Sequence, residues 1–138
     1  MRLTGFILAL TLSGCASPTQ TPTATWLDRV PTPDPSLMQR AVVSRSDDSV
    51  TLRPVSPRGA AVGVSYAFDM PHCGIKSPID VDGSFWDAVG VDPMSVEFDG
   101  RPGAIRLTSA DIATFTSSDG RNLDLVRHVG VKTFHYCQ

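Results

Sequence analysis

The chain has 138 residues, of which 41% are hydrophobic and 19% are charged, with 12 Lys and Arg against 14 Asp and Glu. This length suits one small domain with a single core rather than several domains. The slightly acidic balance argues against a nucleic-acid-binding protein, which usually presents a strongly basic face. It also argues against electrostatic attraction to anionic lipids.

The first residues have the composition of a secretory signal peptide. Arg2 is followed by an apolar run from Leu3 to Leu12, and small residues come directly after it. A charged start, an apolar stretch and then small residues are typical of a signal peptide rather than of a folded element. The run is too short to cross a membrane core, which takes about 20 helical residues. We therefore expect residues 1–14 to be a cleaved signal.

The signal ends in the sequence Leu-Ser-Gly-Cys, with the cysteine at Cys15. This pattern is that of a bacterial lipobox, in which the thiol is diacylated and cleavage then leaves the cysteine as the first residue. Two acyl chains hold a protein on a bilayer where one chain is only marginal. The motif predicts lipid attachment at Cys15 and a location on the extracytoplasmic face of the cell membrane. A non-lipidated signal cleaved near Ala16 is the alternative.

A proline-rich segment follows and predicts a disordered, flexible tether over residues 15–39. Proline lacks an amide donor and restricts the residue before it, so a segment rich in Pro, Thr and Ser disfavours regular structure. Such a spacer would lift a domain clear of the lipid head groups. Trp26, Leu27 and Val30 interrupt the polar composition, and we expect them to dock on the domain or to form one helical turn.

Residues 40–138 have the pattern of one small all-β domain. The clearest strand signal spans 62–68, where every second residue from Val62 to Phe68 is large and apolar. No segment has a sustained helical period. The pattern predicts a small antiparallel sandwich or a partly open barrel with one disulfide. Other segments of strand composition are 41–43, 50–53, 105–108, 123–125 and 129–136.

Three Asp-Gly pairs, which end at Gly83, Gly100 and Gly120, predict turns in this domain. Asp-Gly favours the type I′ hairpin turn, which needs a positive φ at both central residues. The carboxylates near Asp80 and Asp87 offer calcium binding as the alternative. However, an EF-hand loop needs Gly at its sixth position and Glu at its twelfth, which this segment does not provide. We therefore favour turn chemistry and expect no metal.

The three cysteines predict one disulfide once a lipid occupies Cys15. An odd number of cysteines in an exported chain leaves one to be explained, and acylation explains it. Cys73 and Cys137 then remain as a pair in a compartment that permits a disulfide. The bridge would close a long loop and contribute about 4 kcal/mol by the chain-entropy argument.

Two histidines beside these cysteines leave other interpretations open. His72 precedes Cys73, and His135 lies two residues before Cys137. Two His-Cys pairs could form a tetrahedral zinc site, and a cysteine with a histidine base could act as a nucleophile. Neither spacing matches a recognised ligand or catalytic signature, so the disulfide is favoured.

Three short motifs lie close together: Tyr-Ala-Phe ending at Phe68, Pro-His-Cys-Gly-Ile ending at Ile75, and Asp-Gly-Ser-Phe-Trp ending at Trp86. With Cys137 they resemble small uncharacterised exported lipoproteins of actinobacteria. The resemblance implies an exported, disulfide-bonded all-β protein and brings no activity with it. Phe85 and Trp86 would cap one end of the core, or an exposed Trp86 would be a binding anchor.

These observations predict a membrane-anchored lipoprotein of the cell envelope that acts as a non-enzymatic binding or accessory module. Its partners would be the lipid bilayer, reached through the acyl anchor, and an envelope protein or glycan, with Phe85 and Trp86 as candidate binding residues. We expect no cofactor and no nucleic acid. The alternative is a metal- or thiol-dependent envelope enzyme centred on His72, Cys73 and His135.

Overall fold

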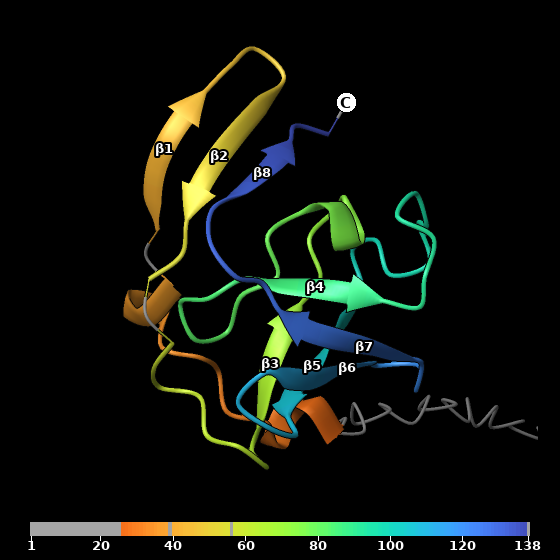
Figure 1. The fold of residues 1–138 in the computed structure, drawn as a ribbon. Coiled ribbons are helices and arrows are strands. Elements are labelled where there is room, and N and C mark those ends of the chain that lie inside the picture. Colours follow the sequence, from red (N-terminus) through yellow and green to blue (C-terminus); the bar gives the residue numbers. More distant parts are fainter. Residues whose placement is uncertain (1–25, 39, 56, 138) are drawn as a thin grey trace, which may run out of the picture.

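The structure is a computed structural model that describes residues 26–38, 40–55 and 57–137 (Figure 1). It is all-β, with two antiparallel sheets packed as an open sandwich, so the predicted fold class is confirmed and the sandwich replaces the barrel alternative. The predicted signal peptide, Cys15 and the first part of the tether lie outside the described residues. No helix in the described part of the chain is long and apolar enough to cross a membrane.

The smaller sheet has three strands in the order β1-β2-β8, and the larger has five in the order β3-β5-β6-β7-β4. Both β8 and β4 are therefore edge strands with one unpaired side. The smaller sheet contains β1 (Ala41–Arg45), β2 (Ser49–Arg53) and β8 (Lys132–His135). The larger contains β3 (Ser65–Asp69), β4 (Trp86–Val89), β5 (Pro102–Leu107), β6 (Ile112–Ser117) and β7 (Asn122–Arg127).

The main core lies on one face of the five-stranded sheet. Ile105 on β5 pairs with Phe115 on β6, which pairs with Leu123 on β7, and all three side chains are at most 1% exposed. This arrangement is the one that alternation of apolar and polar residues predicts for a strand with one buried face. Loop residues complete the core, including Met70, Ile79, Val81 and Phe98.

A second, smaller cluster lies beneath the three-stranded sheet. Leu52 from β2 and Phe134 from β8 pack against Phe85, whose ring meets that of Phe134 edge to face at 5.2 Å between centroids. The chain at the start of β4 thus takes part in the packing of both sheets, because Trp86, the first residue of β4, belongs to the main core.

The Asp119-Gly120 turn joins β6 and β7 as predicted, but its type differs. Gly120 N donates to Ser117 O, and Ser117 N donates to Arg121 O, each at 2.9 Å. Only glycines have positive φ among the described residues, so Asp119 does not take the type I′ conformation. The connection is a type I turn followed by a left-handed Gly120 at φ 86°, the three-residue hairpin with a G1 bulge.

The strand predicted over 62–68 starts only at Ser65. Val64 N donates to Ala61 O at 3.2 Å, and Gly63 has φ +84°, so this part is a turn rather than a strand. Val62 is 58% exposed, and its alternation with Val64 was therefore misleading. At the other end of the domain, β8 starts at Lys132 instead of Val129.

The segment before β1 lies against the domain. Residues Trp26–Arg29 form a short 3-10 helix (η1), as expected for one turn, and Pro35–Met38 form a second (η2). Pro31 O accepts a hydrogen bond of 2.8 Å from Ala67 N on β3, and Pro33 is buried. The folded part therefore begins before residue 40, where composition alone had placed its boundary.

Candidate functional site

The predicted disulfide joins Cys73 and Cys137, whose Cα atoms are 6.1 Å apart. Cys73 precedes the 3-10 helix η3 (Gly74–Lys76), and Cys137 follows β8, so the bond ties a loop of the larger sheet to the end of the smaller one. Both sulfurs are bonded to each other, so neither offers the thiolate that a zinc ion or a nucleophilic mechanism requires. The arrangement around His72, Cys73 and His135 therefore does not support the enzyme alternative.

Phe85 and Trp86 are core residues rather than surface anchors. Phe85 is 0% exposed and Trp86 is 1% exposed. The guanidinium of Arg127 lies over the Trp86 ring at 4.3 Å from its centroid. A partner cannot reach either ring in this structure, so the core-packing alternative holds and the candidate binding role does not.

The loop around Asp80 and Asp82 is a turn, as predicted, but it is buried. The side chains of Asp80 and Asp82 are 0% and 2% exposed. Asp80 Oδ1 accepts hydrogen bonds from the amides of Asp82 at 3.1 Å and Gly83 at 2.7 Å. Burial of these acidic residues is the feature that sequence reasoning missed, because nothing in the local composition indicates it.

Two arginines pair with the acidic side chains of this loop, one from before β1 and one from the end of β7. Arg40 pairs with Asp80 at 3.1 Å, and Arg127 pairs with Asp82 at 3.0 Å. Burial raises the pKa of Asp80, against the hydrogen bond from Gly83 and the charge of Arg40. Arginine and amide groups thus occupy the carboxylate oxygens that calcium would need. No group of three or more His, Cys, Asp or Glu gathers to hold a metal ion within the described residues.

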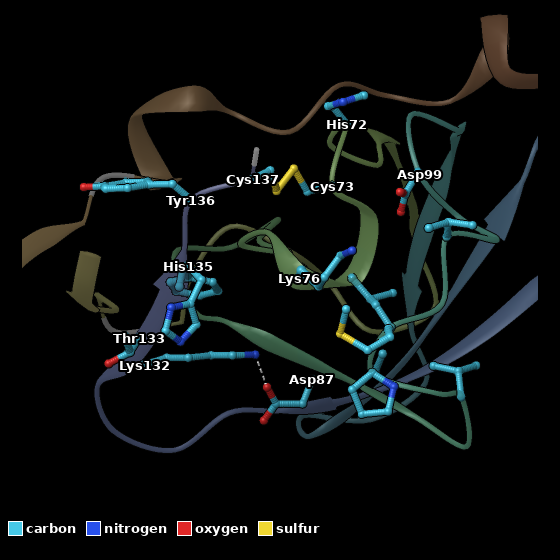
Figure 2. Close-up of a pocket in the computed structure, with 17 residues that line it drawn as sticks. His72, Cys73, Lys76, Asp87, Asp99, Lys132, Thr133, His135, Tyr136 and Cys137 are labelled. Atoms are coloured by element: carbon cyan, nitrogen blue, oxygen red, sulfur yellow. Dashed lines mark hydrogen bonds and ion pairs between the residues drawn. A yellow bond between two sulfur atoms is a disulfide. The ribbon is translucent and has the colours of Figure 1, made fainter. Parts of the chain in front are cut away.

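A groove of about 930 Å³ lies between the two edge strands β8 and β4 (Figure 2). Its volume is in the range of small-molecule sites. The disulfide lies at one end, and η3 and the loop after β4 form the side opposite β8. The apolar lining residues include Ile75, Val91, Pro93, Met94 and Val96, and the polar ones include Lys76, Asp87, Asp99, Lys132 and His135.

Among the described residues, some charged side chains in the groove have ion-pair partners and others do not. Asp87 binds Lys132 and also His128, whose Nδ1 lies 2.8 Å from the carboxylate. Burial would raise the pKa of Asp87, but the hydrogen bonds with Lys132 and His128 outweigh it and lower the pKa. The Lys76 ammonium has neither an ion pair nor a hydrogen bond within the described part of the chain. Asp99 Oδ1 is buried without a hydrogen-bond partner there.

No protein family, curated protein or solved structure is found to match this chain. The resemblance based on the motif around Cys73 therefore stays a hypothesis. What the geometry offers is an open cleft with one apolar wall and a few polar groups, which suits binding. Sequence reasoning singled out His72, His135 and the cysteines near this cleft but not the cleft itself.

Proposed function

We propose that the protein is a lipid-anchored module of the cell envelope that binds a partner and catalyses no reaction. The observation that carries the proposal is the pairing of Cys73 with Cys137. A disulfide is typical of proteins outside the cytosol. It accounts for two of the three cysteines, and the third, Cys15, stands within the lipobox pattern.

The groove supports the binding part of the proposal. Met94 is 70% exposed and Val96 is 68% exposed, and both line the groove beside the unpaired Lys76. Exposed apolar side chains next to polar groups are common where a protein meets a partner. The module would thus present the groove at the membrane surface.

Labelling with palmitate tests the anchor. Cells that express the wild-type chain should incorporate the label and carry the protein in the membrane fraction, whereas Cys15→Ser should do neither. The matched control is the double variant Cys73→Ser and Cys137→Ser, which keeps the lipobox and should still be labelled. Label that persists in Cys15→Ser, or that is absent from the wild type, contradicts the proposal.

Thiol titration separates the binding module from the thiol enzyme. The unreduced full chain with Cys15→Ser should show no free thiol, because the structure joins its two remaining sulfurs. Two titratable thiols, together with bound zinc or a reactive cysteine, would favour the enzyme centred on Cys73.

A further inference from the structure

The outer edge of β8 carries backbone groups that β2 does not use. Tyr136 N donates to Asp48 O at 2.8 Å, which places this pair in hydrogen-bonding register. Paired residues in an antiparallel ladder alternate between hydrogen-bonded and non-hydrogen-bonded positions. By this alternation the amides and carbonyls of Thr133 and His135, which pair with Thr51 and Ser49, point away from β2.

A side-chain contact agrees with this register. The hydroxyls of Thr51 and Thr133 lie 2.8 Å apart, and side chains approach most closely across a non-hydrogen-bonded pair. No hydrogen bond joins the backbone of Thr133 or His135 to another residue within the described part of the chain beyond the β2–β8 ladder. A row of free donors and acceptors therefore runs along this edge.

This free edge faces the groove. Every residue of 132–137 lines it, and η3 and the loop after β4 form its far side. Figure 1 shows β8 as the outer strand of its sheet, with its free side toward η3, and Figure 2 shows Thr133 and His135 beside the cavity. An exposed strand edge is a ready template for another strand, and protein recognition by strand addition uses such edges.

We propose that the edge of β8 is a strand-addition site for an extended peptide segment of a partner protein. The backbone of the segment would pair with Thr133 and His135. Its apolar side chains would pack on Met94 and Val96, and an acidic side chain would pair with Lys76. The inference deepens the proposed binding function and rests on it, but not on the acyl anchor.

The chemistry of the groove selects a partner peptide over two other occupants. Residues 16–25 of the chain contain no Asp or Glu, so they offer no acidic side chain for Lys76, and Pro18 and Pro22 lack the amide donor that a paired strand needs. A second copy paired through β8 in antiparallel fashion would place Thr133 opposite His135 of the other copy. Its strand, Lys132–His135, contains no Asp or Glu, so it also offers no acidic side chain for Lys76.

The test uses the full chain with Cys15→Ser and a short blocked peptide of alternating valine and glutamate. Binding is followed by fluorescence anisotropy, and the site is located by amide NMR. The peptide should bind and shift the amide signals of Thr133 and His135. The same peptide with N-methylated backbone amides should bind at least about ten-fold more weakly, because hydrogen bonds worth about 1 kcal/mol each are removed.

Two variants at Lys76 test whether its positive charge contributes to peptide binding. Lys76→Ala should weaken binding by about three- to five-fold, as expected for a partly exposed ion pair, and Lys76→Arg should restore it. Arg58→Ala removes an exposed cation away from the groove and should have no effect. Far-UV circular dichroism of each variant checks that the fold is kept.

Three results with the peptide would overturn the inference. They are equal binding of the N-methylated peptide, amide shifts that map away from β8, and no binding at the highest soluble concentration. Dimerisation of the free chain with shifts at Thr133 would also overturn it, because the occupant would then be a second copy. Since the assay needs no membrane, its failure is distinguishable from a failure of palmitate labelling.

Discussion

Removal of the Asp80 carboxylate should destabilise the protein more than removal of any exposed aspartate. Asp80 is the one side chain that accepts from both the Asp82 and Gly83 amides and also pairs with Arg40. Asp80→Ala would leave two buried amides without acceptors and an arginine, 24% exposed, without its counter-ion.

The magnitude follows from those losses. An unsatisfied buried amide costs about 1–3 kcal/mol, and breaking a buried ion pair on one side costs about 3–5 kcal/mol. Because Arg40 keeps some contact with water, we expect a total loss of about 3–5 kcal/mol in the free energy of unfolding. This is a large part of the total stability of a small domain, about 5–15 kcal/mol.

Urea unfolding followed by tryptophan fluorescence measures the loss. The matched control is Asp92→Ala, because Asp92 Oδ1 also accepts a backbone amide, that of Met94 at 2.8 Å, but in an exposed loop. The control should cost less than about 1 kcal/mol. Because burial raises the pKa of Asp80, Asp80→Asn should cost less than Asp80→Ala. Equal losses in Asp80→Ala and Asp92→Ala would refute the reasoning.

Three further changes have defined outcomes. Cys73→Ser with Cys137→Ser opens a loop with a sequence separation of 64 and should lower the free energy of unfolding by about 4 kcal/mol; an unchanged urea midpoint would contradict this. Gly74→Ala should destabilise the fold, because Gly74 has φ +54° and a Cβ there would collide with the Asp99 carboxylate. Gly90→Ala is the control in the same urea experiment, because Gly90 also has a positive φ but a Cβ there would meet open space. The pKa of Asp87 is lowered in the folded state, so its stabilisation is present above its unfolded pKa and is lost as the pH falls through the folded one. In Asp87→Asn the free energy of unfolding should therefore fall less steeply than in the wild type between about pH 5 and pH 3. An equally steep fall in both proteins would count against this prediction.

The strands that the sequence predicted best are those with one buried and one solvated face. Leu123 and Leu125 on β7 are 1% and 0% exposed, and Asp124 between them is exposed. The same alternation of residue types predicted a strand at Val62 and Val64, where the structure has none. Alternation indicates that two faces of a segment differ in polarity, but it does not indicate whether a partner strand exists. At Gly63 a left-handed φ turns the chain before β3 begins.

The groove could not be predicted because its two sides are far apart in sequence. β4 ends at Val89 and β8 begins at Lys132, and neither strand pairs with the other. Which strands end at a sheet edge depends on pairing order, and local composition does not record that order. The disulfide was the one long-range contact within reach of the sequence, because counting cysteines needs no knowledge of the fold.

The buried loop before β4 explains how the groove keeps its shape. Phe85 and Trp86 are neighbours in an extended segment, so their side chains point to opposite sides, Phe85 under the smaller sheet and Trp86 into the core of the larger. Arg40 lies 5.3 Å from the Phe85 ring, and Arg127 lies 4.3 Å from the Trp86 ring. Each arginine thus holds one aromatic ring and one carboxylate of the same loop. Because β4 starts at Trp86, the contacts of the two arginines with this segment fix the position of β4 relative to β8. The disulfide fixes the end of the groove at Cys73 and Cys137. The width of the groove therefore depends on both the arginine contacts and the disulfide.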